Sequence, residues 1–394
     1  MNKAIVIIPT YNERENIQKV IPLLFAQFAK VSNWDMGVLV VDDTSPDKTY
    51  AVVEQLQKKY PKLHLLVNAK KSGLGGAYLK GMDTAFNKLK AEVVFEFDAD
   101  LSHDLKKIPD FMRAIDQGAD MVLGSRYIPG GSIPQNWGLH RKFLSVVGNL
   151  IIMFVLTNFS IRDWTTGYRA IKKQVYQKVV GSIDSERFMG YTFQIGFLYT
   201  ALKQGFTVKE IPFHFVDREI GESKIGSEYI KNTLLYIFKI RLQELFESRI
   251  FKFLVVGGTG TLIQLVALQI LRATLPEFTF LFFTKFIAAT FISIEIAIFS
   301  NFLLNNAWTF ADRKLEKSRL FLKFLQFNVT SGGSIAIQLL VNYSGERFIG
   351  LISLFKLPIV NMVVDTGLLF AMTGIIIGLF WNFFAYNKFI WKSK

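Results

Sequence analysis

Through residue 225 the chain alternates between short apolar runs and longer stretches in which apolar residues recur every three or four positions. The short runs, typical of buried strands, are residues 5–8, 38–41, 63–67, 93–97 and 121–123. The longer stretches, typical of amphipathic helices, are residues 15–28, 49–60, 77–89 and 106–117. This alternation predicts an α/β domain over residues 1–225, with a parallel sheet covered by helices on both faces.

Beyond residue 250 the pattern changes to long apolar stretches with few charges. Residues 253–271 contain no charged residue and lie between Lys252 and Arg272. A helix of this length crosses the hydrocarbon core of a bilayer. Three further stretches of similar character are residues 280–304, 324–343 and 357–386. We therefore predict an all-α domain of four transmembrane helices over residues 251–394.

The loops between these stretches differ in charge. The loop between the second and third stretches contains Arg313, Lys314, Lys317, Arg319 and Lys323, whereas the other two loops hold three basic residues between them. By the positive-inside rule this loop and both termini face the cytosol. The amino terminus also runs straight into the first predicted strand without a signal-peptide pattern. We expect an integral protein of the cell membrane with its first domain in the cytosol.

The apolar half contains an internal repeat. The sequence Lys-Phe-Leu at 252–254 recurs at 323–325, and an Asn-Phe…Asn-x-aromatic-x-aromatic pattern at 301–310 recurs at 382–391. Two helical hairpins of one type explain this best. We expect the repeated asparagines to join helices by hydrogen bonds. Glu295 and Asp365 are equally candidates for function and for pairing within the bundle, because isolated charges are costly in lipid.

Residues 226–250 connect the two halves. Ile230, Leu234 and Ile237 recur at helical spacing, with Lys231 and Lys239 among them. This pattern predicts an amphipathic helix at a membrane interface. Residues 150–157 form another apolar run that is too short to span, and we expect this run to lie against the bilayer.

Composition narrows the classes of function. The chain is 51% hydrophobic, has a formal net charge of +14 and contains no cysteine. The absence of cysteine excludes disulfides and thiolate metal sites. With apolar spans in the same chain, the positive charge favours an anionic membrane surface and a phosphate-rich substrate over nucleic acid. The first predicted strand is not followed by G-x-G-x-x-G, which argues against a dinucleotide-binding dehydrogenase.

Acidic residues follow two of the predicted strands. The second strand ends in Asp42-Asp43 and the fourth in Asp98-Ala99-Asp100. Ligands of such sheets bind beyond the carboxyl ends of the strands. Two carboxylates at i and i+2 can bind one divalent cation, with a diphosphate completing its coordination shell. Alone the pair is often a solvated turn, but its position after a buried strand favours a metal site.

Basic residues occur where they suit phosphate groups. Arg126, Arg141, Arg218 and Lys224 each lie in a polar segment beyond a predicted element. Arginine binds phosphate oxygens with two parallel hydrogen bonds, and lysine supplies a mobile charge. Any one of these residues alone is more often a solvated surface charge than a phosphate ligand. Together with the acidic pair, the four residues favour phosphate binding.

Five motifs in order carry a resemblance to a known family: Val6-Ile7-Ile8-Pro9-Thr10-Tyr11-Asn12-Glu13, Val40-Val41-Asp42-Asp43-x-Ser45-Pro46-Asp47, Asp98-Ala99-Asp100-Leu101, Gly124-Ser125-Arg126-Tyr127 and Gly221-Glu222-Ser223-Lys224. Residues 3–230 resemble dolichol-phosphate mannose synthases and related polyprenyl-phosphate hexose transferases, which are inverting family-two glycosyltransferases of the GT-A fold. Residues 250–391 resemble the GtrA-type four-helix membrane domain.

The resemblance implies a role for each matched residue. The base and ribose of a nucleotide-sugar would be bound by Pro9, Tyr11, Glu13 and Asp42. The metal, Mg²⁺ or Mn²⁺, and the diphosphate would be bound by Asp98, Ala99 and Asp100. The donor and acceptor phosphates would be bound by Arg126, Arg141, Ser145, Lys173, Arg218 and Lys224, with Asp100, Arg126 and Arg141 catalytic and Arg126, Arg141 and Ser145 on the acceptor phosphate.

Two departures from the family keep alternatives open. Ser102 stands where many relatives have Gln, and Asp163-Trp164-Thr165-Thr166-Gly167-Tyr168 stands where mannosyl transferases often read Asp-Pro-x-Ser-Gly-Phe. We expect transfer of mannose from GDP-mannose to dolichyl or undecaprenyl phosphate, with UDP-glucose as the alternative donor. In another class, the chain would be a lipid-linked sugar flippase or transporter with a nucleotide-sensing domain.

Overall fold

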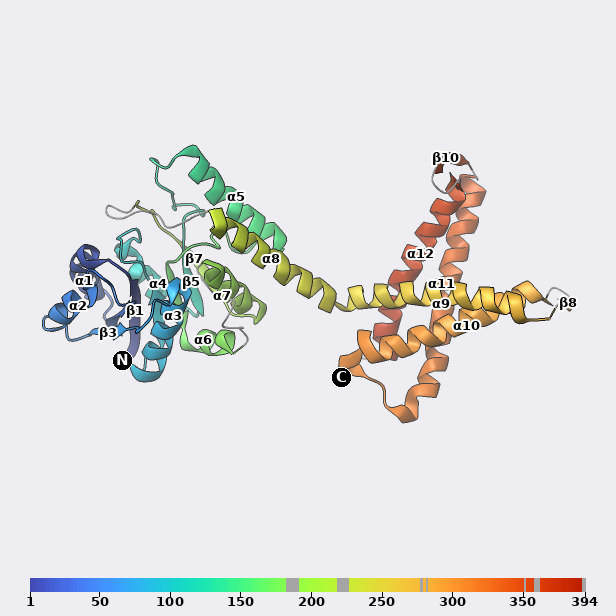
Figure 1. Cartoon of the computed structure of the whole chain (residues 1–394), viewed down its shortest axis with the longest axis horizontal. Coiled ribbons are helices and arrows are strands. Elements are labelled where there is room, and N and C mark those ends of the chain that lie inside the picture. The colour runs from blue at the N-terminus through green and yellow to red at the C-terminus, as the bar shows by residue number, and fades with distance from the viewer. Residues whose placement is uncertain are drawn as a thin grey trace. The chain divides into compact units, whose positions relative to one another are not determined.

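The computed structural model describes residues 1–181, 191–217, 227–276, 279–280, 283–350, 352–357 and 362–391. The chain forms two compact units, Met1–Arg241 and Leu242–Lys394. The division falls within α8 (Ser227–Glu247), in the segment that the sequence places between the two domains. Figure 1 shows the elements of each unit.

The first unit is built on a seven-stranded sheet of order β3-β2-β1-β4-β6-β5-β7. Its strands are β1 (Asn2–Thr10), β2 (Trp34–Asp42), β3 (Leu63–Val67), β4 (Val93–Glu96), β5 (Met121–Ser125), β6 (Arg169–Lys172) and β7 (Val208–Pro212). The five predicted strands are confirmed. The prediction of a parallel sheet is wrong in one respect, because β6 runs antiparallel to both β4 and β5.

Helices cover both faces of this sheet. One face packs against α1 (Arg14–Phe28), α2 (Thr49–Gln57) and α4 (Ile108–Asp116). The other packs against α3 (Gly73–Asp83), α5 (Leu139–Val155), α6 (Lys173–Val180), α7 (Tyr191–Lys203) and part of α8. Successive residues of β1 alternate between the two cores: Ala4 and Val6 lie in the first, Ile5 and Ile7 in the second. Burial on both faces explains why these strands read as continuous apolar runs.

The second unit contains the helices α9 (Arg249–Thr274), α10 (Lys285–Leu304), α11 (Leu320–Phe348) and α12 (Thr366–Ala385). Helix α9 packs against α10, and α11 packs against α12 (Figure 1). Within the described residues, none of the helices combines the length and the hydropathy expected of a membrane crossing.

Two short hairpins correct the prediction of an all-α unit. Strands β8 (Thr279–Phe280) and β9 (Phe283–Thr284) precede α10, and β10 (Ser353–Leu357) and β11 (Met362–Asp365) precede α12. The fourth helix therefore begins at Thr366 and not at residue 357. Apolar β-strand residues there were indistinguishable by hydropathy from the helix that follows.

The structure confirms the internal repeat. Each helical hairpin ends in a π-helical turn, Asn305–Thr309 after α10 and Tyr386–Ile390 after α12. Directly after these turns, Phe310 and Trp391 stack on each other with ring centroids 4.5 Å apart and planes 7° from parallel. Equivalent residues of the two repeats thus meet in the small core of this unit.

Candidate active site

The loops after β1 and β2 are held together by a buried carboxylate. Asp42 is 0% exposed. It accepts hydrogen bonds from Thr10 Oγ1 at 2.8 Å, Ser45 N at 2.8 Å and Ser45 Oγ at 2.6 Å. The resemblance implies that Asp42 binds the base or ribose, whereas in the structure its carboxylate fixes the two loops.

Three adjacent strands are followed by a strained residue. Asn12, Thr44 and Leu101, in the loops after β1, β2 and β4, have φ of 59°, 54° and 63°. Positive φ is unfavourable for residues other than glycine and gathers at functional sites. The carboxyl ends of β1, β2 and β4 are therefore the strained edge of the sheet.

Tyr11 and Glu13 follow half-buried Pro9 in the loop after β1. Lys71 Nζ lies 3.8 Å from the centroid of the Tyr11 ring. The Glu13 carboxylate accepts a hydrogen bond from Asn16 Nδ2 at 2.7 Å. The loop thus presents an aromatic ring, a cation and a carboxylate at this edge, which are groups suited to a base and a ribose.

Asp98 and Asp100 leave the sheet directly after β4. Asp98 Oδ1 accepts a hydrogen bond from Tyr78 OH at 3.3 Å, and Asp100 Oδ1 accepts one from Ser102 N at 3.1 Å. The Asp98 side chain is 38% exposed. Its carboxylate is therefore anchored on one side and accessible to a ligand on the other.

His103 lies behind Asp98 and was assigned no role from sequence. Its Nδ1 accepts a hydrogen bond from Asp98 N at 3.2 Å, so the ring proton is on Nε2, 3.6 Å from Asp98 Oδ2. Burial lowers the pKa of His103, which keeps the ring neutral. The ring stacks on Tyr168 with centroids 4.8 Å apart.

Arg126 follows β5 and forms a two-pronged ion pair. Its Nε and Nη2 donate to the two carboxylate oxygens of Asp163, each at 2.7 Å, and Nη2 also donates to Thr165 Oγ1 at 2.9 Å. Asp163 is 0% exposed and the Arg126 side chain 10% exposed. Arg126 thus joins the end of β5 to the loop 163–168.

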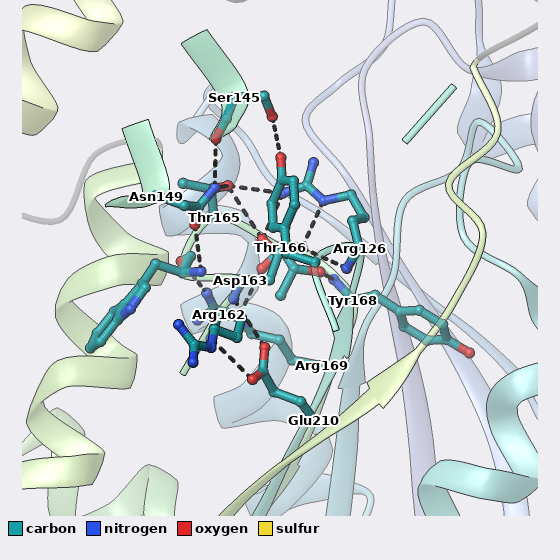
Figure 2. Close-up of polar contacts among 12 residues, drawn as sticks. Arg126, Ser145, Asn149, Arg162, Asp163, Thr165, Thr166, Tyr168, Arg169 and Glu210 are labelled. Atoms are coloured by element: carbon teal, nitrogen blue, oxygen red, sulfur yellow. Dashed lines mark hydrogen bonds and ion pairs between the residues drawn. The ribbon is translucent and has the colours of Figure 1, made fainter. Parts of the chain in front are cut away.

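That loop is fixed by three further elements (Figure 2). Glu210 of β7 accepts hydrogen bonds from the backbone N–H groups of Arg162 and Asp163, both at 3.0 Å. Asn149 of α5 accepts one from Trp164 N at 2.8 Å. Arg169 of β6 donates to three backbone carbonyls, those of Trp164, Thr166 and Gln194.

A buried acid lies beneath this network. Glu96 Oε2, on β4, is 3.7 Å from Arg169 Nε, and both side chains are 0% exposed. Burial raises the pKa of Glu96 to about 7, and Arg169 opposes that shift.

Helix α5 carries the predicted acceptor residues. Arg141 Nη1 is 3.3 Å from Asp217 Oδ2, and its guanidinium lies 3.8 Å from the Trp137 ring centroid. Ser145 Oγ shares a hydrogen bond with Tyr127 OH at 2.5 Å. Because Tyr127 follows Arg126, this bond ties α5 to the same corner of the sheet.

The structure places Lys173 away from the phosphate site that the resemblance implies for it. It starts α6 directly after the antiparallel β6, and its N–H donates to Glu92 O at 2.9 Å. It lines a cavity with Asn2 and Trp34, where β1 and β2 begin. Lys173 therefore lies at the edge opposite Asp98, because β6 runs against its neighbours. Arg218 and Lys224 lie outside the described residues.

The acidic pair fits a cation shared with a substrate. Among the residues that the structure describes, no three acidic or imidazole side chains form a complete metal site. Asp98 and Asp100 offer two carboxylates on one loop. This donor set suits Mg²⁺ or Mn²⁺, since Mg²⁺ is usually bound by one or two carboxylates together with substrate phosphates.

Several contributors were missed from sequence. Asp163, Glu210, Asn149 and Tyr78 act through contacts between elements far apart in the chain. Asp163 had a signal, because it begins the segment 163–168, which stands where mannosyl transferases often read Asp-Pro-x-Ser-Gly-Phe. The others occupy ordinary positions of a strand or helix, and no local pattern distinguishes them.

Comparison with family models matches both units. Residues 5–180 match "Glycosyl transferase family 2", and residues 252–391 match "GtrA/DPMS, transmembrane domain". A solved structure, a mannosyltransferase from Pyrobaculum calidifontis in complex with GDP-Man and Mn²⁺, is 14% identical with a TM-score of 0.38, covering 97% of this chain and 86% of the other. This structural likeness is too low to bear on function.

Two curated relatives are similar in sequence. Polyprenol monophosphomannose synthase of Mycolicibacterium smegmatis is 38% identical over 237 residues, which are 60% of this chain and 85% of the relative. Dolichol-phosphate mannosyltransferase of Pyrococcus furiosus is 32% identical over 348 residues, 86% of this chain and 89% of the relative. With its GT-A-like α/β unit, the chain belongs to glycosyl transferase family 2 and is a glycosyltransferase followed by a GtrA/DPMS domain.

Proposed function

We propose that this glycosyltransferase transfers mannose from GDP-mannose to the phosphate of a polyprenyl lipid. The observation that carries the proposal is the pair Asp98 and Asp100 at the end of β4, beside a loop fixed by Arg126 at the end of β5. The names of both relatives, polyprenol monophosphomannose synthase and dolichol-phosphate mannosyltransferase, support this substrate pair.

The donor would bind at the strained edge of the sheet. Pro9, Tyr11 and Glu13 would contact the nucleoside in the loops that Asp42 fixes. Asp98, Ala99 and Asp100 would bind a divalent cation and the diphosphate, and that cation would neutralise charge on the leaving diphosphate. Arg218 and Lys224 remain proposed phosphate ligands.

The acceptor phosphate would approach along α5. Arg141 and Ser145 lie on this helix. Arg126 follows β5 and precedes Tyr127, which is bonded to Ser145. We propose that these three residues bind the same phosphate. The Arg126 guanidinium is already paired with Asp163, which fixes its orientation before a substrate arrives. Preorganised charge of this kind needs no rearrangement during reaction.

The chemistry places little demand on acid or base groups. A lipid phosphate monoester is anionic at pH 7, so its oxygen attacks the anomeric carbon without a general base. One displacement inverts that carbon, through a transition state with oxocarbenium character as in glycoside hydrolysis. The protein chiefly positions the two substrates and excludes competing water.

The helical unit would lie in the membrane. Residues 252–391 match a family described as transmembrane. We propose that residues 251–394 cross the cell membrane four times, with both termini and the catalytic unit, residues 1–225, in the cytosol. Helix α5 exposes Leu139, Phe143 and Phe154, each at least 65%. Such a face on the first unit, with residues 226–250, suits contact with a bilayer surface.

A transfer assay tests the proposal. Detergent-purified protein is given polyprenyl phosphate, Mg²⁺ or Mn²⁺, and either GDP-mannose or UDP-glucose, and lipid-extractable sugar is measured. Mannosyl lipid that is lost with EDTA is the expected result. Glucosyl lipid alone would change the donor, and donor binding without any lipid product would favour the nucleotide-sensing transporter.

A further inference from the structure

The helical unit contains a cavity of about 150 Å³ to which all four helical segments contribute. Gly257 lies on α9, Asn301 on α10, Phe327 on α11 and Asn382 on α12. Asn305, in the π-helical turn after α10, also lines it. The cavity therefore lies where the two helical hairpins meet.

Its walls carry hydrogen-bond acceptors for which the described part of the chain provides no donor. The Oδ1 atoms of Asn301, Asn305 and Asn382 are buried and have no partner among the described residues. Asn305 is only 1% exposed. Buried polar groups in native proteins are rarely left unpaired, because they have lost their bonds to water. These three amides therefore indicate a bound group that the cavity accommodates.

The carboxamide oxygens of two neighbouring asparagines of the same repeat have hydrogen-bond partners. Asn306 Oδ1 accepts hydrogen bonds from Trp391 Nε1 at 3.1 Å and Leu315 N at 2.9 Å, and Asn387 Oδ1 accepts one from Arg313 Nη1 at 2.8 Å. The Asn306–Trp391 and Arg313–Asn387 bonds join the segment after α10 to the segment after α12, whereas the expectation concerned bonds between helices. Asn382 joins α12 to α11, because its Nδ2 donates to Ser334 Oγ at 3.1 Å. The Oδ1 atoms of Asn382 and of its equivalent Asn301 have no described partner, and both residues line the cavity.

The lining defines the chemistry of the bound group. No acidic or basic residue is among the described residues that line the cavity, so a neutral ligand suits it. Hydroxyl groups both donate and accept, and they satisfy an amide in either of its two orientations. The volume is several times the roughly 30 Å³ that one water occupies in the liquid, so it admits a hydroxylated group larger than a single water.

We propose that this cavity binds the hexosyl head group of the lipid-linked product through the amides of Asn301, Asn305 and Asn382. The inference rests on the proposed function, which supplies a polyhydroxyl group attached to a lipid. Gly257 lines the cavity, and a Cβ added there meets no atom within 4 Å, so a larger side chain at this position would enter open space.

Binding of defined lipids to the full-length chain tests this site. The probe is a short-chain mannosyl-phosphoryl-polyprenol, titrated into protein in nanodiscs in the absence of donor. The comparison probes are the same polyprenyl phosphate without sugar, free mannose, and phosphatidylglycerol. Asn305→Leu and Asn382→Leu are expected to raise the dissociation constant of the mannosyl lipid at least fivefold and to leave that of the unglycosylated lipid unchanged.

Two glycine variants keep the test independent of the asparagines. Gly257→Leu fills the cavity, whereas Gly258→Leu makes the same change at the next residue, where an added Cβ also meets open space and which does not line the cavity. Only Gly257→Leu is expected to weaken binding of the mannosyl lipid, with both variants melting at the same temperature.

The outcomes separate this site from the proposed function. If the wild type forms mannosyl lipid but all variants bind it equally well, the cavity site is wrong and the proposed function stands. Equal weakening for lipids with and without sugar, or binding of phosphatidylglycerol with the same pattern, would overturn recognition of the hexose. If the wild type forms no mannosyl lipid, the proposed function fails by itself.

Discussion

The ion pair of Arg126 and Asp163 controls how one loop meets the end of β5. Both prongs are 2.7 Å long, and the carboxylate is fully buried. Lysine retains the charge but not the planar fork, so it cannot make both bonds. A buried acid that loses a partner is strongly destabilising, whereas an exposed pair contributes little.

Arg126→Lys is therefore expected to lower the transfer rate by about 10- to 100-fold, because the loop 163–168 and the residue-126 cation both lose their alignment. Steady-state transfer and thermal melting measure the effect. Arg113→Lys, in an exposed i,i+3 pair with Asp110, is the control and should leave both unchanged. Equal behaviour of the two variants would contradict the role given to the Asp163 pair.

Asp100→Asn tests the acidic pair. The change removes a charge but retains an oxygen that can accept from Ser102 N. Transfer is expected to fall about 100-fold or more, as for loss of transition-state charge stabilisation, with the melting temperature nearly unchanged. The control is Asp104→Asn, since Asp104 likewise accepts a backbone N–H from two residues on. Near-normal turnover by Asp100→Asn would contradict the proposal that Asp100 binds the divalent cation.

The positions of site residues in the fold were predictable from sequence where those residues belong to a local motif. Asp98, Asp100 and Arg126 stand within three residues of the end of an apolar run, so the edge of the sheet at which they lie followed from the order of strands and loops. Lys173 was misplaced because the direction of β6 depends on pairing with β4 and β5, and no local pattern encodes it. Asp163 forms a contact across 37 residues, which the sequence does not show.

At the scale of elements, α3 packs unusually close to β1. A Cβ built on Gly81 would lie 2.6 Å from Ile7 Cγ2 and 3.1 Å from Val41 Cγ2. Both side chains are buried in the core between the sheet and α3, so neither has room to move. This approach helps to place Tyr78, which bonds Asp98, at the carboxyl edge of the sheet.

Gly81→Ala is expected to destabilise the first unit by about 1–3 kcal/mol through overpacking. Gly148→Ala, within α5, is the matched control, because an added Cβ there meets nothing within 4 Å. It should instead stabilise its helix by up to about 1 kcal/mol. Chemical unfolding of both variants measures the difference, and the same sign for both would contradict the close packing of α3.

Element types were largely predictable, because a continuous apolar run and an apolar period of 3.6 residues are both local patterns. The exceptions have physical causes. β6 is four residues long and contains Arg169 and Lys172, so it lacks an apolar run. The start of α12 was placed too early because Met362, Val363 and Val364 of β11 are apolar and directly precede the apolar helix.

At the scale of the whole molecule, the two units have separate cores. The second unit has a small core in which aromatic residues from both repeats meet, with Phe310 stacked on Trp391. Trp391 is 1% exposed and its Nε1 donates to Asn306 Oδ1. One side chain near the end of the chain thus connects the two halves of the repeat.

Trp391→Ala is expected to destabilise the second unit by about 3–5 kcal/mol, the usual cost of removing a buried aromatic side chain. Faster hydrogen exchange in α10 and α12 should result, with exchange in β1 and β4 and affinity for the nucleotide-sugar unchanged, because those depend on a different core. Phe389→Ala, an aromatic residue two positions earlier and 41% exposed, is the control and should change neither. Loss of nucleotide-sugar affinity in Trp391→Ala alone would mean that the catalytic unit depends on the helical core for its stability.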